Sequence, residues 1–481
     1  MAIFGSSSPY DELLSASEKK PGLVANAVRN WQTPIREFNE GIFASALERA
    51  NPQQNPLAYV QITIDMMVLS LHGRQIEMTK QALASICNGS VQMVQVARVH
   101  ELIDRLARAL GHMATSNNDI PDVCGLVVDM VDVMNAQMVS QMRDDTQEAG
   151  FVKQTLGSSK GIRLTPLHIE CLRLCILARR RALHERVVRT ILDVEFASFG
   201  LQSGEARAQA FMQYRYYAGM IYAALADDAS LRMAQKQWML TFAIPGKFAS
   251  SIQLEAFKKL TLVNLMLDGK PVKLPAFFAP THVKAIEGPA TLYSKIADDF
   301  VGTKSMARAL SKIRASQNHL ANDNNAGLAG LMVQRMPAQF IKRMGNIYSS
   351  MRLGTLAKAI GFDAHPLANH ISNVNEIATI LAQFIESMND DSVTVVQQDG
   401  SPIDVSSIVR FAPVCATLSS VPNAPALSAN ERIAIEQQWS ERIQVQVAQT
   451  EALRFRLVHL DRHIALTDEY VSNSREQVSN V

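Results

Sequence analysis

Apolar residues recur at helical spacing along most of the first 313 residues. The segments with this pattern are 24–50, 59–71, 76–87, 91–113, 123–142, 166–196, 211–225, 231–242, 252–267 and 290–313. A period of three to four residues is typical of a helix with one buried face. Alternating strand patterns are nearly absent from these segments, so the chain is predicted to form paired helices stacked into an α-solenoid.

One stretch comes close to a known helical repeat. Gly219 and Tyr222 keep the three-residue offset of the Gly and Tyr in the first helix of a tetratricopeptide repeat, whereas Leu231 stands where that repeat has a small Ala. The match is partial, so the prediction of a solenoid rests on spacing. Residues 271–289 contain several prolines and are predicted to form a loop.

From about residue 327 the repeated helical period gives way to mixed elements. One helix is followed by a short extended piece at 351–354, and Thr355 is expected to cap a brief helix. Gly361 stands where a left-handed residue would end that helix. Pro366 is expected to open a longer helix that buries one face.

The next residues carry a hairpin signal. Asp399-Gly400 lies between the β-branched runs 393–398 and 403–409, and such a pair is typical of a tight β-turn. The order of helix, short strand, helix, helix and hairpin is that of a winged helix. Residues 362–392 contain no Lys or Arg. A basic helix that reads DNA is therefore not expected, and a protein contact is favoured.

The last long segment, 428–471, contains no Pro or Gly. Ser428 and Glu431 have the spacing of a capping box, which marks the start of a helix. The following positions form a heptad seam: Trp439, Ile443, Gln446, Thr450, Leu453, Leu457, Leu460 and Ile464. A helix of this length would extend about 60 Å, more than one small domain covers. We expect it to join a multi-subunit bundle, with a hairpin folded back on the solenoid as the alternative.

The composition fits a folded chain of two or three units. Of its 481 residues, 47% are hydrophobic and 19% are charged, and the formal net charge of +2 gives no general attraction to nucleic acid or an anionic membrane. The five cysteines do not form a dense disulfide framework, which favours a reducing compartment. The N-terminus lacks a signal-peptide pattern. The longest uncharged run, 411–430, is too polar to cross a membrane and is interpreted as a linker.

The candidates for metal chemistry are weak. None of the 11 histidines lies two residues from another, so the His-x-His pair of a zinc isopeptidase is absent from the sequence. His168, Cys171 and Cys175 share a helical face but extend over about 10 Å of axial rise, which favours a buried apolar face over a zinc site. His459 and His463 lie one turn apart without the Glu of a metalloprotease motif. No metal or other cofactor is predicted.

Two basic motifs have simpler interpretations. The run GSSKG at 157–161 resembles a phosphate loop only in composition, because no Ser or Thr follows Lys160. Lys258, Lys259 and the triplet Arg179–Arg181 are interpreted as solvated faces, with partner contact as the alternative.

Three runs carry a family resemblance. They are FMQYRYYAGMIY at 211–222, LEAFKKLTLVNLMLDGK at 254–270 and NDNNAGL at 322–328. These runs resemble the PCI-domain family, in particular its COP9 signalosome subunit 3 members. With the winged helix and the last helix, the similarity covers roughly 164–409 and 428–471.

This resemblance implies a non-catalytic subunit of the complex that removes a ubiquitin-like modifier from cullins. It implies other PCI and MPN subunits of that complex as partners, indirect contact with cullin-RING ligases, and a location in the cytoplasm and nucleus. Neither a membrane nor nucleic acid is expected as a partner. A PCI subunit of the proteasome lid or of a translation initiation complex is the runner-up, and a DNA-binding winged-helix regulator is a weak alternative.

The chain is thus predicted to be mainly α-helical, with a TPR-like solenoid, a winged-helix PCI domain and a long C-terminal helix. The predicted parts are a mobile tail at 1–21, a helical-repeat arm at 22–200, a PCI domain at 201–411 (helical part 201–321, winged helix 322–411), a linker at 412–427, the bundle helix at 428–471 and a tail at 472–481.

The hairpin is predicted to be an interaction edge. Winged helices of the PCI family pack side by side, and an exposed hairpin strand offers unpaired backbone groups to a neighbouring sheet. The predicted interface residues are therefore Val393, Val395, Ile403 and Val405, together with the eight seam positions between Trp439 and Ile464 given above.

Overall fold

The computed structural model confirms a mainly α-helical fold, and its described residues also form two small sheets. It describes residues 10–411 except for 12, 16–20, 30, 33–39, 70–75, 117–118, 149–161, 194–195, 200–203, 244–248, 275–279, 303–304, 369, 372, 389–392 and 397–402. The chain divides into two units, Met1–Phe411 and Ala412–Val481. The second unit, with the predicted seam helix, lies outside the described residues, as does the run 157–161.

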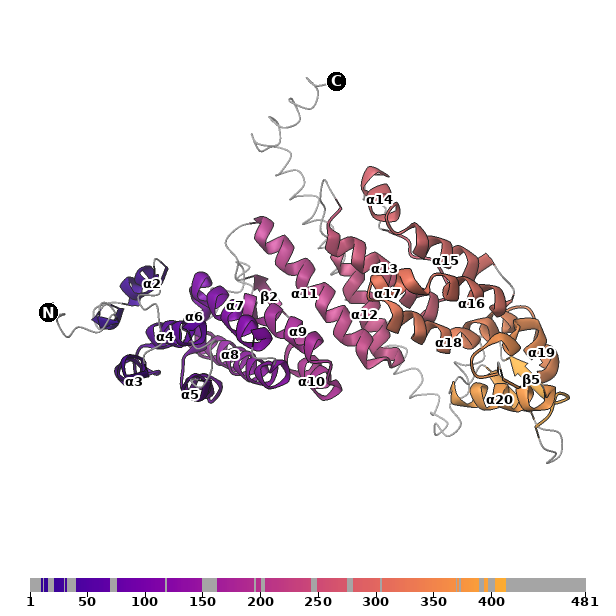
Figure 1. Cartoon of the computed structure of the whole chain (residues 1–481), viewed down its shortest axis with the longest axis horizontal. Coiled ribbons are helices and arrows are strands. Elements are labelled where there is room, and N and C mark those ends of the chain that lie inside the picture. Colours follow the sequence, from indigo (N-terminus) through magenta and orange to yellow (C-terminus); the bar gives the residue numbers. More distant parts are fainter. Residues whose placement is uncertain are drawn as a thin grey trace, which may run out of the picture. The chain divides into compact units, whose positions relative to one another are not determined.

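Helices of the first half pack on neighbours that are near in sequence. Their bounds are α2 Pro21–Arg29, α3 Glu40–Arg49, α4 Pro56–Leu69, α5 Ile76–Cys87, α6 Met93–Arg98, α7 His100–Ser116, α8 Ile120–Glu148, α9 Pro166–Ala178 and α10 Arg181–Val187. Helix α4 packs on α7, and both α7 and α8 pack on α9 (Figure 1). The predicted segment 91–113 is divided into α6 and α7, because the backbone at Val99 is extended.

A parallel pair of short strands lies beside these helices. Strand β1 (Ile162–Leu164) pairs with β2 (Phe196–Phe199), and α9, α10 and the π-helix η2 (Val188–Leu192) connect them. The prediction of helix through residue 196 was wrong at this end. Strands of three and four residues are too short to show an alternating pattern, and their pairing depends on distant parts of the chain.

Helix α8 contains a long apolar segment. Residues Ile120–Ser140 have a mean hydropathy of 1.3 and satisfy the length and composition of a membrane-spanning helix. Half of the segment is buried within the protein, and α8 packs on α5, α6, α7 and α9. Its Asn135 bonds to His168 of α9, as expected of a helix inside a folded core.

Helices α11 to α17 also pack on neighbouring helices. The bounds are α11 Gly204–Leu225, α12 Asp228–Thr241, α13 Ser251–Leu267, α14 Pro280–Glu287, α15 Thr291–Gly302, α16 Met306–Ala315 and α17 Gln317–Asn322. Helix α14 lies within the segment predicted to be a loop, so that prediction was wrong in part. Pro280 is the first residue of α14, a position where a helix needs no N–H donor. The side chain of Ile286 is fully buried on the inner face of this helix.

The winged helix has the predicted order of elements. It consists of α18 (Ala326–Gly345), β3 (Ser350–Arg352), α19 (Leu353–Ile360), α20 (Val374–Ser387), β4 (Val393–Val396) and β5 (Ile408–Phe411). Gly361 ends α19 with φ +70°, which confirms the predicted left-handed cap. A side chain there would also place a Cβ 2.9 Å from the Ser305 hydroxyl oxygen.

Helix α19 begins earlier than predicted. Thr355 is not its cap, because the helix starts at Leu353. The N–H of Leu353 donates to the Ser407 carbonyl at 2.8 Å, and the N–H of Gly354 donates to the Val405 carbonyl at 3.1 Å. These two carbonyls satisfy first-turn donors that a capping side chain would otherwise serve.

Helix α20 begins later than predicted. Pro366 does not open it; Asn373 caps it, and its side-chain oxygen accepts from the Asn375 N–H at 3.1 Å. The preceding turn is held by His365, whose ring stacks on Phe362 and bonds through Nε2 to the Val333 carbonyl oxygen at 2.9 Å. These contacts of His365 hold the chain in a turn, so the helix predicted to begin at Pro366 begins only at Val374.

The hairpin also differs from the prediction. Val396 lies opposite Ile408, a register that a two-residue turn at 399–400 would not produce. The Asp399-Gly400 pair itself lies outside the described residues. Ile403 and Val405 lie in the connection between β4 and β5 rather than in a strand. Asp404 holds it by accepting from the N–H groups of Ser406 and Ser407, and such an Asx turn competes with strand pairing.

Candidate functional site

The sheet of the winged helix has two edges. Its strand order is β3-β5-β4, with both pairs antiparallel. Phe411 N–H donates to the Ser349 carbonyl and Leu353 N–H donates to the Ser407 carbonyl, so residues 407, 409 and 411 bond toward β3. Because backbone groups alternate along a strand, Ile408 and Arg410 bond toward β4.

This alternation determines which groups of β4 are open. Thr394 lies opposite Arg410 and Val396 opposite Ile408, so their backbone groups point inward. The N–H and C=O groups of Val393 and Val395 therefore point away from β5, to an edge that pairs with no other strand in the described part of the chain. An edge strand with unpaired donors and acceptors is a template for a strand of another chain.

The predicted interface residues are partly brought together here. Val393 is buried at the inner face of the sheet, and Val395 is half-buried against the core. Ile403 and Val405 pack on the same core from the connection. The eight seam positions from Trp439 to Ile464 lie outside the described residues, so their role as an interface remains a prediction.

The opposite edge was not among the predicted interface residues. Ser350 and Arg352 of β3 are exposed, and their backbone groups alternate away from β5. Just before β3, Ile347 and Tyr348 are exposed by 67% and 47%. Two large apolar side chains beside an outer strand favour contact with another protein. The only feature of this edge that the sequence predicted was the short extended piece at 351–354.

The exposed start of α20 carries no basic side chain. Its first turn contains Glu376, and the large apolar residues Leu367 and Val374 are exposed by 51% and 44%. Duplex DNA requires phosphate contacts from Lys or Arg. This surface is therefore better suited to a protein than to DNA.

A buried polar cluster joins the helical part to the winged helix. Lys258 Nζ donates to Glu255 Oε1 at 2.8 Å and to Asp323 Oδ1 at 3.0 Å, while Lys259 Nζ donates to Asn325 Oδ1 at 2.7 Å. The two lysines are only 8% and 4% exposed. Their interpretation as a solvated face was wrong, because carboxylate and amide partners from the α17–α18 turn compensate for burial.

Tyr293 completes this cluster. Its hydroxyl donates to Asp323 Oδ2 at 2.8 Å and accepts from Asn325 Nδ2 at 2.7 Å. Lys259 also lies 5.8 Å from the ring centroid of Tyr216. The three runs that carry the family resemblance, 211–222, 254–270 and 322–328, therefore meet at one point in space.

The charges in the cluster support one another. Burial would lower the pKa of Lys258, but hydrogen bonds to Glu255 and Asp323 outweigh burial and leave that pKa raised. Burial would raise the pKa of Asp323, but hydrogen bonds from Lys258 and Tyr293 hold it below its ordinary value. Burial lowers the pKa of Lys259. A paired buried network of this kind positions the helices that contribute to it.

The histidine and cysteine face of α9 is buried, as predicted. His168 Nδ1 accepts from the Thr165 N–H at 3.1 Å, and its Nε2 lies 3.0 Å from Asn135 Oδ1. Burial raises the pKa of the Cys171 thiol. Within the described ranges, no group of three His, Cys, Asp or Glu side chains is arranged to hold a metal ion.

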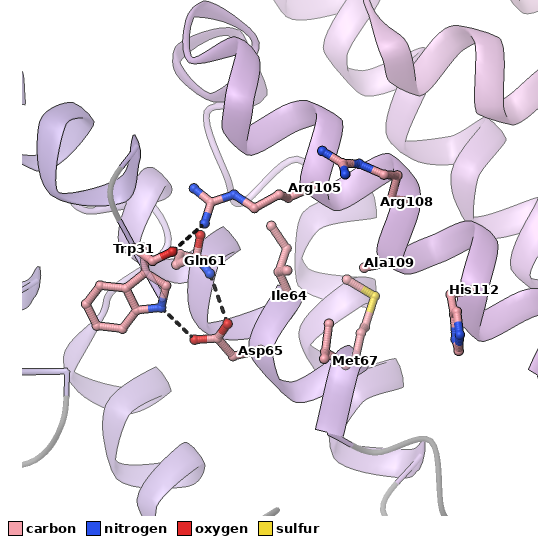
Figure 2. Close-up of a pocket in the computed structure, with 10 residues that line it drawn as sticks. Trp31, Gln61, Ile64, Asp65, Met67, Arg105, Arg108, Ala109 and His112 are labelled. Carbon is pink, nitrogen blue, oxygen red and sulfur yellow. Dashed lines mark hydrogen bonds between the residues drawn. The ribbon is translucent and has the colours of Figure 1, made fainter. Parts of the chain in front are cut away.

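A pocket of about 360 Å³ lies between α4 and α7 (Figure 2). Asp65 accepts from Trp31 Nε1 at 2.9 Å, from Gln61 Nε2 at 3.0 Å and from the Tyr10 hydroxyl at 3.2 Å. Arg105 donates to the Trp31 carbonyl at 3.4 Å. These contacts tie residues 10 and 31 to α4, and Asp65 is too fully bonded to act as a general base.

The family model for COP9 signalosome complex subunit 3, N-terminal helical repeats, matches residues 153–281, a range that includes β1 through α13 and reaches the start of α14. A COP9 signalosome complex subunit 3 from Drosophila melanogaster is 25% identical over 215 residues, which are 41% of this chain and 46% of the relative. One from Dictyostelium discoideum is 20% identical over 237 residues, which are 49% of this chain and 52% of the relative.

The chain thus spans about half the length of the curated relatives it matches. The matched residues include two of the three converging runs, 211–222 and 254–270. Residues 153–281 are therefore similar to the N-terminal helical repeats of COP9 signalosome complex subunit 3.

Proposed function

We propose that this chain is a non-catalytic scaffold subunit of a COP9 signalosome. It would hold neighbouring subunits by protein contacts and act indirectly on cullin-RING ligases. The observation that carries this proposal is that the matched helical repeats lead through a common polar cluster into a winged helix, and that neither outer edge of its sheet pairs with another described strand. Open edges of this kind are suited to pairing with a strand of another subunit.

The absence of catalysis is part of the proposal. The histidines lack the His-x-His spacing of a zinc isopeptidase, and the polar residues of the Asp65 pocket are engaged with one another. Isolated protein is expected to leave a modified cullin uncleaved with or without added zinc. Cleavage by the isolated chain that a chelator abolishes would contradict this part of the proposal.

The decisive experiment identifies the partners. The full chain, tagged and expressed in cells, is recovered together with its bound proteins, which mass spectrometry then identifies. We expect other PCI and MPN subunits of the signalosome in fixed stoichiometry, from both cytoplasmic and nuclear extracts. Recovery of proteasome lid or translation initiation subunits without signalosome subunits would favour the runner-up assignment.

A further inference from the structure

A broad groove lies along α12, the end of α13 and the end of α18. These helices pack side by side (Figure 1), and the groove has a volume of about 1020 Å³. Its basic lining residues come from α12, from the segment that follows α13 and from α18: Arg232, Lys236, Lys270, Lys273, Lys342 and Arg343. Asp268 is the one acidic residue in this lining. A nearly neutral chain thus concentrates positive charge on one surface.

Some of these charges are already engaged. Asp268 accepts from Arg232 Nη1 at 2.5 Å and from Gln235 Nε2 at 2.8 Å. Arg343 Nη1 donates to the Phe300 carbonyl oxygen at 2.8 Å, and the guanidinium lies over the Phe300 ring. These contacts fix the positions of Arg232 and Arg343 in the lining. Because Asp268, the only carboxylate of the lining, already bonds to Arg232 and Gln235, it does not neutralise the lysines.

Three lysines of the lining have no charged partner among the described residues. Lys236, Lys270 and Lys273 are exposed, and none of them forms an ion pair or a hydrogen bond through its ammonium group with a described residue. Some exposed cations on other surfaces, such as Arg181 and Arg108, pair with a carboxylate one turn away. Unpaired like charges that converge on one groove attract a ligand of opposite charge.

Stabilisation of helix ends explains only part of this pattern. Lys342 lies in the last turn of α18 and Lys270 follows α13, where cations interact favourably with the negative end of a helix. Lys236 lies inside α12, and Lys273 lies beyond the end of α13. Neither of these two has a helix-end role, so a ligand accounts better for their position.

The lining favours a protein ligand over a phosphate or a nucleic acid. No helix begins in the lining, so it lacks the free N–H groups that typically bind phosphate, and its unpaired cations are lysines rather than forked arginines. It contains no aromatic side chain on which a base could stack. Met239, Leu267 and Pro271 provide an apolar floor beside the charges.

We propose that this groove binds an acidic segment of a partner protein, with carboxylates on Lys236, Lys270 and Lys273 and an apolar residue on the floor. Complementary charge would bring the segment to the groove, and the floor would fix its register. The groove extends the proposed scaffold function to a second contact surface, separate from the edge of β4. The two surfaces are tested by different variants.

The test uses the full chain and a fluorescein-labelled peptide with the sequence Glu-Asp-Leu-Glu-Asp-Leu-Glu-Asp. Fluorescence anisotropy measures the dissociation constant at low and at physiological salt. We expect the triple variant Lys236→Glu, Lys270→Glu and Lys273→Glu to weaken binding at least about tenfold, because three ion pairs become repulsive contacts. Wild-type binding should weaken with salt, because exposed charges are screened.

A matched control changes the net charge equally. Arg98, Arg180 and Arg308 are exposed and lie outside the groove lining, and their replacement by Glu should leave the dissociation constant within about threefold. Val395→Pro, which tests the sheet edge, should leave peptide binding unchanged. Circular dichroism checks that each variant is folded.

Three outcomes would overturn the proposal. The first is no peptide binding at low salt by folded wild-type protein. The second is equal weakening by the groove and control variants, which would indicate a response to net charge alone. The third is tighter binding of tripolyphosphate or of a twelve-residue oligothymidylate than of the peptide, which would assign the groove to another class of ligand.

Discussion

His168 shows how burial changes the behaviour of one side chain. It is fully buried on α9, and this burial lowers its pKa to about 3. In the unfolded chain a histidine titrates near pH 6.5. Between these two values the unfolded state therefore binds a proton that the folded state does not, so the free energy of unfolding falls as the pH falls.

We predict that this loss amounts to about 2 kcal/mol between about pH 7.5 and pH 5.0, since one pKa unit corresponds to about 1.4 kcal/mol. Urea unfolding at the two pH values measures it. His168→Gln should remove this part of the pH dependence, whereas His112→Gln, on an exposed position of α7, should retain it. Equal pH dependence in wild type and His168→Gln would show that the buried ring is not the source.

Gly219 has a packing role that its spacing alone does not explain. A Cβ at this position would lie within 2.6 Å of two atoms of the Trp238 indole, whose Nε1 donates to the Tyr216 carbonyl at 3.2 Å. Trp238 is fully buried between α11 and α12. Glycine is therefore required because the next helix approaches the backbone, and the partial tetratricopeptide signal identified the right residue.

Gly219→Ala is predicted to lower the free energy of unfolding by about 1–3 kcal/mol, the usual effect of overpacking. The matched control is Gly330→Ala in α18, where an added Cβ meets no atom within 4 Å. That change should raise stability by up to about 1 kcal/mol, because alanine favours a helix over glycine. Thermal unfolding of both variants measures these effects. A similar change of melting temperature in both variants would contradict the close approach of Trp238 to the backbone at Gly219.

At the scale of elements, the open edge of β4 has a direct test. Proline at Val395 removes an N–H that points away from β5, whereas proline at Thr394 removes one that points toward Arg410. Val395→Pro should therefore weaken complex assembly more than folding. Thr394→Pro should reduce thermal stability as well, because it breaks the ladder between β4 and β5.

The measurement compares recovery of partner subunits with the melting temperature for each variant. If Val395→Pro lowers both to the same extent as Thr394→Pro, the strand serves the core of the winged helix and not a neighbouring subunit. The outward donor at residue 395 would then have no role in assembly.

The ends of the helices show when the local sequence is sufficient to predict a boundary. Gly361 ends α19 as predicted, because the preference of glycine for positive φ is local to one residue. The starts of α19 and α20 were wrong, because carbonyls of Val405 and Ser407 and the ring of His365 reach them from other parts of the chain. Local spacing contains no information about such partners.

At the scale of the whole molecule, the seam helix at 428–471 remains a prediction. Removing the chain after Leu427 should leave residues 10–411 folded, since Met1–Phe411 forms a unit by itself. We expect the truncated chain to lose its place in the complex. Each buried Leu or Ile contributes about 1.5–3 kcal/mol, so four such seam positions would dominate retention.

Co-purification of truncated and full chains, compared at equal expression, tests this prediction. Circular dichroism of the truncated chain gives the folding control. Partner subunits recovered in full stoichiometry without residues 428–481 would show that the seam is dispensable.

The sequence alone determined the helical class, the order of elements in the winged helix and the family resemblance. These follow from periodicity, from the conformational preferences of single residues and from short runs, all of which are local properties. Only the tertiary structure decided that Lys258 and Lys259 are buried, that Val395 rather than Thr394 faces the open edge, and that three unpaired lysines share a groove. Each of these depends on what a distant segment places opposite the residue, because burial, pairing and electric field are set by neighbours in space and not by neighbours in the chain.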